Sequence, residues 1–123
     1  MLAAESRLRR RADFARVMRS GLRSGRPELV VHLLPAAPGE AAGPPRAGFA
    51  ASRAIGNSVV RHRVLRVLRA QTRPLLGALP AGSLLVVRAL QPAASADSAQ
   101  LGSALRSAVD SAVRKAARQG AAA

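Results

Sequence analysis

This chain of 123 residues has no cysteine, no tryptophan and no tyrosine, and it has few acidic residues. Without cysteine it can form neither disulfides nor thiolate metal sites, which is compatible with a reducing cytoplasm. The acidic residues are Glu5, Asp13, Glu28, Glu40, Asp97 and Asp110. Hydrolysis of phosphodiesters by side chains usually needs clustered carboxylates that hold metals, or a pair of positioned histidines. The sequence shows neither pattern, so we predict no catalytic residue and no metal-binding side chain.

Long apolar runs are also missing. No stretch approaches the ~18 consecutive apolar residues of a membrane span, and the start, MLAAESRLRRRADF, lacks the apolar core of a signal peptide. A chain of this length is expected to form one domain with a modest core. We therefore expect a soluble, cytoplasmic, single domain over 1–123, with 1–8 and 119–123 as disordered tails.

Positive charge is what the chain has in excess. Twenty basic residues against six acidic ones give a net charge of +14, and Lys115 is the one lysine among them. A biased coding composition explains arginine over lysine, but it does not explain the size of the net charge. Self-repulsion at this charge density disfavours the compact state unless a polyanion is near. Nucleic acid or an anionic membrane is the expected partner.

The order of the expected elements indicates an α+β fold. Helices are expected at 11–21, at 56–69 and from Asp97 onward, and strands at 28–35, 46–52 and 83–90. Glycine and proline predict a loop over 36–45. The order α-β-β-α-β-α predicts helices packed on one small sheet.

The segment GNSVVRHRVLRVLR, residues 56–69, combines apolar residues at helical spacing with arginines. At about 100° per residue, its apolar side chains fall within an arc of about 100°. They are Val60, Val64, Val67 and Leu68. A second arc of about 120°, roughly opposite, contains basic side chains. These are Arg63, Arg66, Arg69 and Arg73, with Arg61 at the border.

The arginine arc has no acidic neighbours, because residues 41–96 contain no Asp or Glu. Like charges on one helix face repel by a few tenths of a kcal/mol per pair, and external phosphates would relieve that repulsion. Gly56 allows a tight turn, and Asn57 is a suitable N-cap that leaves backbone N–H groups near Arg61. We therefore favour an anion-binding helix over a merely solvated one.

The stretch SRAIGNSVVRHRVLRVLR, residues 52–69, resembles the signature of the bacterial ribonuclease P protein component. That signature has Ser-Lys, Gly-Asn, an apolar pair and then Arg-Asn-Arg-x-Lys-Arg. Three further segments are similar to the family: DFARVMRSG to its first helix, RAGFAAS to the strand before the signature, and SLLVVRAL to its last strand. The resemblance covers about residues 7–115. It implies the family's fold, with a left-handed β-α-β crossover through the arginine helix, a connection that is right-handed in about 98% of cases.

The resemblance also implies a set of RNA-binding residues. They are Arg53, Gly56, Asn57, Arg61, His62, Arg63 and Arg66, and the basic arc of the helix adds Arg69 and Arg73 to the RNA-binding set. His62 stands where the family has Asn and can still donate a hydrogen bond. Leu65 stands where the family usually has Lys, and it cannot replace a cation.

A groove for the single-stranded 5′ leader of precursor tRNA is the second implied site. Its residues here are Phe14, Val17, Met18 and His32. Met18 and His32 stand where relatives carry aromatic residues, so base stacking is expected to be weaker than in relatives. Core packing is the alternative role for Phe14.

The function implied is that of the protein subunit of ribonuclease P, with the catalytic RNA and precursor tRNA as partners. The RNA would cleave with Mg²⁺, and neither a membrane nor another protein is an expected partner. A general RNA-binding or ribosome-associated protein is the alternative. A membrane-surface protein is a weaker one, because the arginine helix has neither Trp nor Phe.

Overall fold

The computed structural model describes residues 2–39 and 43–122 of the chain. Its helices and strands are, in order, α1 (Arg11–Ser20), β1 (Leu22–Gly25), β2 (Leu29–Leu34), β3 (Arg46–Ala51), α2 (Ser58–Thr72), β4 (Leu84–Ala89) and α3 (Ser98–Ala122). Short 3-10 helices are η1 (Ala4–Ser6), η2 (Arg53–Ile55), η3 (Arg73–Ala78) and η4 (Gln91–Ser95). The α+β class, the three helices and three of the strands are as expected from the sequence. The expected loop at 36–45 has neither helix nor strand at 36–39 and 43–45, and 40–42 lie outside the described residues.

Strand β1 corrects the expected element order, which becomes α-β-β-β-α-β-α. Its four residues, LRSG, include an arginine, a serine and a glycine, so they carry no β-branched or alternating apolar pattern. β1 forms because it pairs antiparallel with the apolar strand β2, where Leu22 lies opposite Leu33. Pairing with a neighbour, rather than local preference, makes it a strand.

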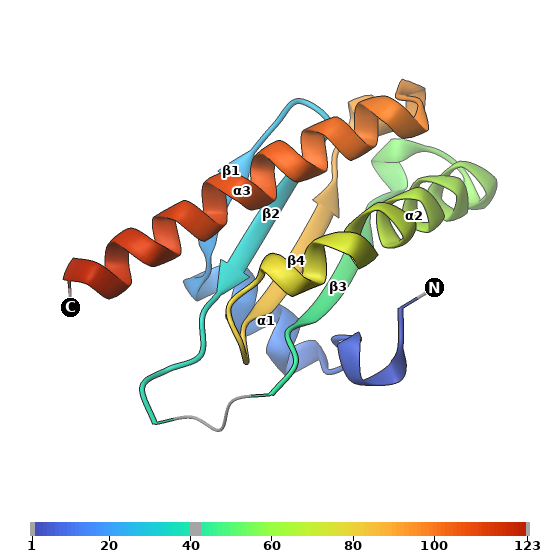
Figure 1. The fold of residues 1–123 in the computed structure, drawn as a ribbon. Helices are drawn as coiled ribbons and strands as arrows, with labels where there is room; N and C mark the ends of the chain where they lie inside the picture. The colour runs from blue at the N-terminus through green and yellow to red at the C-terminus, as the bar shows by residue number, and fades with distance from the viewer. Residues whose placement is uncertain (1, 40–42, 123) are drawn as a thin grey trace.

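The sheet order is β1-β2-β4-β3, in which β3 and β4 are parallel and the other pairs are antiparallel. In Figure 1, α2 and α3 lie in front of the sheet and α1 lies behind it. The chain leaves β3, returns through α2 in front of the sheet and enters β4 on the left of β3 (Figure 1). This is a left-handed crossover, as the family resemblance implied.

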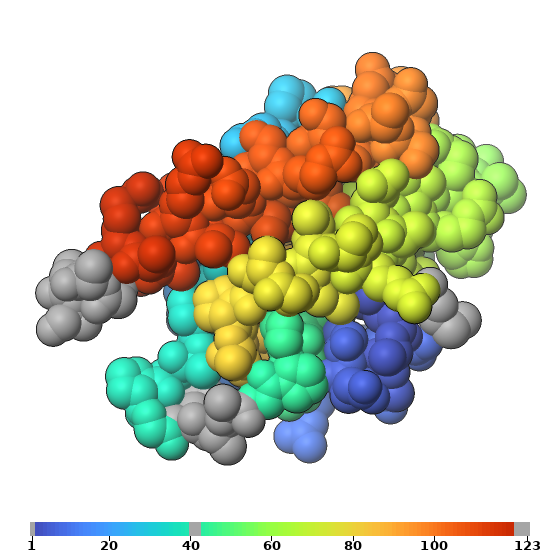
Figure 2. All heavy atoms as spheres, viewed as in Figure 1, coloured from blue at the N-terminus to red at the C-terminus, as the bar shows by residue number. Residues whose placement is uncertain are grey.

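The larger hydrophobic core lies between the sheet and helices α2 and α3, which lie side by side in Figure 2. Every second residue of a strand enters this core, because side chains alternate across a sheet. From α2 it receives Val64 and Leu68, which are fully buried, and Val60 and Val67, which are partly buried. The apolar arc inferred from the sequence is therefore the packing face of α2.

The opposite face of the sheet carries a smaller core beneath α1. It consists of Leu8, Val17, Leu84 and Val86, with Phe14 and Leu34 packed against it. The expected N-terminal tail is packed as well: Leu8 belongs to this smaller core and Leu2 to the larger one. The backbone N–H of Leu8 donates to the carbonyl of Ala47, 3.0 Å away. Residues 2–8 are thus packed along β3 rather than disordered. At the other end the helix α3 runs to Ala122, so the expected tail at 119–122 is helical, and residues 1 and 123 lie outside the described residues.

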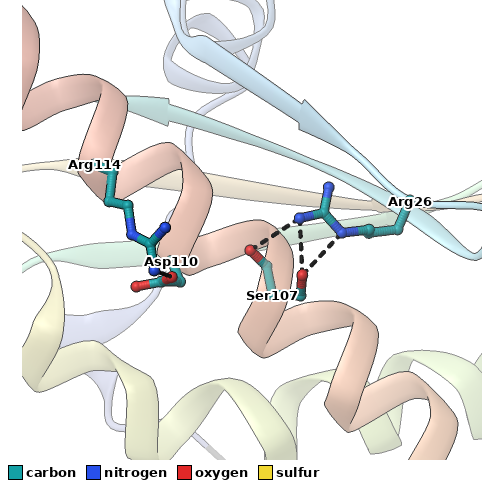
Figure 3. A network of polar contacts seen from close by, with 4 residues as sticks. All are labelled: Arg26, Ser107, Asp110 and Arg114. Carbon is teal, nitrogen blue, oxygen red and sulfur yellow. Dashed lines mark hydrogen bonds and ion pairs between the residues drawn. The ribbon is translucent and has the colours of Figure 1, made fainter.

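Polar contacts attach α3 to the β1–β2 hairpin. Arg26, in the turn between these strands, donates from Nε and Nη2 to Oγ of Ser107, at 3.0 and 2.8 Å (Figure 3). One turn further along α3, Arg114 pairs with Asp110 at 2.6 Å. Lys115 Nζ donates to the carbonyl of Arg23 at 2.7 Å. Arg26, Arg114 and Lys115 therefore make contacts within the protein, at a distance from α2 in the sequence.

Candidate nucleic-acid interface

The arginine helix α2 begins as its sequence indicates. Asn57 is the N-cap, and its Oδ1 accepts a hydrogen bond from the backbone N–H of Val60 at 3.0 Å. Gly56 has φ of 150°, a conformation that side chains other than glycine rarely adopt. A Cβ added at Gly56 would also lie 3.2 Å from Cβ of Val60. The Gly-Asn pair therefore sets the direction in which α2 leaves the loop.

The exposed ridge of α2 carries positive charge with no acidic partner. His62, Arg66, Arg69 and Arg73 are all exposed, and Arg53 is exposed just before the helix. Among the described residues, the single ion pair is the one between Arg114 and Asp110. The structure thus brings Arg66, Arg69 and Arg73 together on a surface without acidic partners among the described residues. We call these three arginines, together with the hydrogen-bonding side chain of His62, the α2 ridge. Leu65, at the departure from the family signature, is only half-buried.

Arg63 does not belong to this ridge. Its Nη2 donates to the carbonyl of Ala94 at 2.7 Å, and its Nη1 donates to the carbonyl of Ala96 at 3.4 Å. These carbonyls lie at the end of η4, so the guanidinium ties η4 to α2. Arg61 is half-buried in the first turn of α2, with its Nη2 3.5 Å from Oγ of Ser58. The Nε of Arg61 is buried without a hydrogen-bond partner.

A cavity of about 460 Å³ lies between the N-terminal segment, β3 and α2. Arg69 lines it, with its guanidinium carbon 5.9 Å from the centroid of the Phe49 ring, within the range of a cation–π contact. Arg7 and Arg9 also line the cavity. Sequence reasoning missed both, because Arg7 lay in the expected disordered tail 1–8 and Arg9 follows it in a basic stretch without periodicity.

The residues predicted for the leader groove lie on the α1 side of the sheet. The Phe14 ring rests on Gly48, where an added Cβ would overlap it. Met18, one turn further along α1, is 36% exposed, whereas Val17 is fully buried. Phe14 and Met18 therefore share one flank of the helix. Val17 packs in the smaller core beneath the helix.

His32 forms part of the sheet beneath α1. It is 4% exposed, and neither ring nitrogen has a hydrogen-bond partner. Its burial lowers the pKa of the imidazole below the usual 6.5, and the nearby charges of Arg88 and Arg23 lower the same pKa further. His32 is therefore neutral at pH 7. Sequence reasoning missed Arg88, which lies in an apolar strand outside the family signature.

Metal sites and membrane-spanning helices are both missing from the described part of the chain. Residues 2–39 and 43–122 contain no group of three His, Cys, Asp or Glu side chains able to hold a metal ion. No helix in those residues is long and apolar enough to cross a membrane.

The family model for ribonuclease P matches residues 2–113. The chain belongs to the bacterial ribonuclease P protein family. It is 58% identical over 106 residues to the ribonuclease P protein component of Streptomyces bikiniensis, covering 82% of this chain and 86% of that one. It is 52% identical over 115 residues to the component of Thermobifida fusca, covering 86% of this chain and 78% of that one.

Solved structures of ribonuclease P proteins have the same fold. The Staphylococcus aureus protein matches with a TM-score of 0.75 at 25% identity, covering 85% of this chain and 93% of that one. The Thermotoga maritima protein, in complex with 1-(4-fluorophenyl)-2-thiourea, matches with a TM-score of 0.69 at 24% identity, covering 82% and 94%. The chain is thus a ribonuclease P protein subunit, part of an endoribonuclease complex that has an RNA partner, and this family functions in tRNA 5′ maturation.

Proposed function

We propose that this ribonuclease P protein binds two RNAs on two sides of one sheet. The observation that carries the proposal is the placement of the α2 ridge on one face of the sheet and of Phe14 and Met18 on the other, where we call the space between α1 and the sheet the α1 groove. The two surfaces adjoin at the β3 edge, because Arg69 and Phe14 line the same cavity there. A single phosphate-binding patch would serve a general RNA-binding protein equally well. Two adjoining surfaces, one basic and one with an apolar flank, suit a subunit that holds a catalytic RNA and its substrate at the same time.

The first surface binds the catalytic RNA. Arg53, Arg66, Arg69 and Arg73 supply charge for backbone phosphates, and His62 supplies a hydrogen bond. Gly56 and Asn57 act on this surface through the backbone, because they fix where α2 begins and how it is directed. Arg61, at the first turn, adds a charge whose buried Nε has no partner within the protein.

The second surface receives the single-stranded leader of precursor tRNA. Phe14 and Met18 provide an apolar flank on α1, and His32 lies in the strand below. With one aromatic side chain on that flank, stacking adds about 1–3 kcal/mol for one base at most. Leader binding in this protein therefore depends more on phosphate contacts than on stacking.

Cleavage itself is assigned to the RNA, with Mg²⁺ held by RNA phosphates. The described side chains do not fit a Mg²⁺ site, since no three carboxylates or histidines gather in them. The protein contributes positioning and electrostatic stabilisation close to the cleavage site. We place this activity in the cytoplasm, where the chain's lack of cysteine is no disadvantage.

A processing assay tests the proposal. The protein is mixed with a bacterial ribonuclease P RNA at low Mg²⁺, and 5′ cleavage is measured on two precursor tRNAs, one with a leader of several nucleotides and one with a single-nucleotide leader. The protein is expected to stimulate cleavage of the first substrate more strongly, and Phe14→Ala is expected to narrow that gap. Stimulation that ignores leader length would show a charge-neutralising subunit without a leader groove.

A further inference from the structure

Arg88 occupies a position on β4 where an apolar residue would be expected. Side chains alternate along the strand, so Leu84, Val86 and Arg88 point to the α1 side of the sheet. Leu84 and Val86 are buried in the smaller core, whereas Arg88 is half-buried, and its Nε is buried without a hydrogen-bond partner. A buried donor on a charged group, left unpaired, is costly to the folded state.

His32 is the neighbour of Arg88 on the same face. On β2, Val30 lies opposite Arg88 and His32 lies opposite Val86, so His32 and Arg88 are diagonal neighbours across two strands. The influence of Arg88 on the pKa of His32 agrees with this closeness. Both ring nitrogens of His32 are buried and unpartnered. Two adjacent polar side chains on this face thus lack acceptors within the described residues.

The position of this pair relates it to the leader groove. Gly48, on which the Phe14 ring rests, lies opposite Val86, and Val86 lies opposite His32. Phe14 and His32 therefore mark one row across the sheet, and Arg88 lies in the next row. In this row Ala50 on β3 and Arg88 itself are half-buried, whereas Val30 on β2 is buried, so the row is accessible to solvent on its β3 side.

The chemistry of the pair selects an anion. Arginine has donors only, and a neutral histidine has one donor, so a single oxygen-rich anion can accept from both. No carboxylate of the described chain forms an ion pair with Arg88. Among anions, a phosphate is the natural occupant, because the partner of this subunit is RNA.

We propose that Arg88, with His32 beside it, binds a backbone phosphate of the single-stranded leader on the α1 side of the sheet. This inference rests on the proposed function, since it assigns the leader to the α1 groove. It adds a phosphate contact that compensates for the aromatic residues missing from Met18 and His32. The arginine is kept at this position for binding, and the folded protein is less stable because of it.

Arg88→Met is the test variant, since it keeps the length of the side chain and removes the charge. Arg118→Met is the matched control, because Arg118 is exposed near the end of α3. The holoenzyme is assembled with a bacterial ribonuclease P RNA, and its affinity is measured for precursor tRNAs with a leader of several nucleotides and of one. Arg88→Met is expected to weaken binding of the longer leader by about tenfold, as for the loss of one charge-assisted contact. Binding of the single-nucleotide leader is expected to stay unchanged, and Arg118→Met is expected to change neither.

Two further measurements separate binding from folding. Thermal unfolding of the free protein is expected to give Arg88→Met a Tm equal to or above that of the wild type, because the variant removes an unpaired charge. Arg88→Lys is expected to recover most of the lost affinity. If the wild type prefers the longer leader and Arg88→Met keeps that whole preference, the assignment of Arg88 is wrong while the leader groove stands. If the wild type shows no preference for the longer leader, the groove itself is wrong. A lowered Tm for Arg88→Met would assign Arg88 a packing role instead.

Discussion

Arg63 and Arg66 lie one turn apart on α2, yet only the side chain of Arg63 makes hydrogen bonds within the described part of the protein. The guanidinium of Arg63 donates to two carbonyls at the end of η4, whereas the side chain of Arg66 is exposed on the α2 ridge. A charge that already satisfies buried carbonyls is poorly placed to contact phosphate. The family signature treats both arginines alike, but the fold assigns one to holding η4 and the other to the surface.

Replacement of each by glutamine is expected to separate the two roles. Arg63→Gln is expected to destabilise the protein by about 1.5–3 kcal/mol, because it removes charge-assisted hydrogen bonds to partly buried carbonyls. Arg66→Gln is expected to leave stability unchanged and to lower the salt-dependence slope of RNA binding by about one. Urea unfolding and RNA binding at several salt concentrations measure both effects. Equal loss of slope in the two variants would show that Arg63 also contacts phosphate.

His32 is expected to make stability depend on pH. Its folded-state pKa is lowered by burial and by Arg88 and Arg23, so the unfolded chain binds more protons in acid. The contribution of neutral His32 to the free energy of unfolding is fully present above the pKa of the unfolded chain's histidine, about 6.5. It is lost as the pH falls toward the pKa that His32 has in the folded protein. Between the two pKa values the loss is up to about 1.4 kcal/mol per pH unit. Urea unfolding from pH 7.5 to 5 is expected to show a weaker pH dependence for His32→Phe than for the wild type.

At the scale of the element, α2 could be read closely from its sequence and β1 could not. The start of α2 follows from its N-cap at Asn57, and its packing face follows from an apolar arc that includes Val64. The structure agrees with both expectations. β1 and the N-terminal segment owe their order to partners that are remote in the sequence, such as β2 and Ala47. The sequence does not predict a site at Arg88 for the same reason, because His32 and Arg88 are brought together only by the pairing of β2 with β4. Sequence periodicity thus predicts which face of a helix or strand is buried. The proximity of His32 and Arg88 depends on the register of strand pairing, which the sequence does not show.

The two faces of α2 allow a matched test on one helix. Val64→Asp is expected to unfold the domain, because Val64 is 0% exposed and the change buries an unpaired charge. Val59→Asp, in the first turn, is expected to keep the wild-type stability within about 0.5 kcal/mol, because Val59 is 77% exposed and an acidic residue suits a helix N-terminus. Circular dichroism and thermal unfolding give the answer. A folded Val64→Asp together with an unfolded Val59→Asp would reverse the assignment of the faces.

At the scale of the whole molecule, the net charge of +14 is spread over surfaces that serve different partners. Arg26, Arg63 and Lys115 donate hydrogen bonds within the fold, whereas the α2 ridge and Arg53 remain exposed. Fewer cationic side chains are therefore free for direct phosphate contacts than the formal charge indicates, although all of them still contribute to the electrostatic field of the protein. The positive charge is still concentrated enough on α2 to engage several phosphates together.

RNA binding is accordingly expected to weaken steeply with salt. A log–log plot of affinity for the catalytic RNA against salt concentration is expected to have a slope with a magnitude of several, since each phosphate contact adds about 0.7–0.9 to that magnitude. A slope with a magnitude near one would contradict a multi-phosphate surface.

The rigorously RNA-free protein is expected not to cleave precursor tRNA at any Mg²⁺ concentration, and to restore cleavage when added to the catalytic RNA at low Mg²⁺. Mg²⁺-dependent cleavage by the protein alone would reveal an active site within the chain.

The contact between the N-terminal segment and β3 has a consequence for how copies of the chain behave in a crowded solution. β3 is an edge strand, and an open edge offers unpaired backbone groups to which another chain can add. The bridge between Arg7 and Ala47 occupies part of this edge, and Arg9 adds charge near it. The N-terminal segment therefore blocks part of the β3 edge from pairing with a strand of another chain. A chain lacking residues 1–9 is expected to self-associate in sedimentation experiments at concentrations where the full chain stays monomeric.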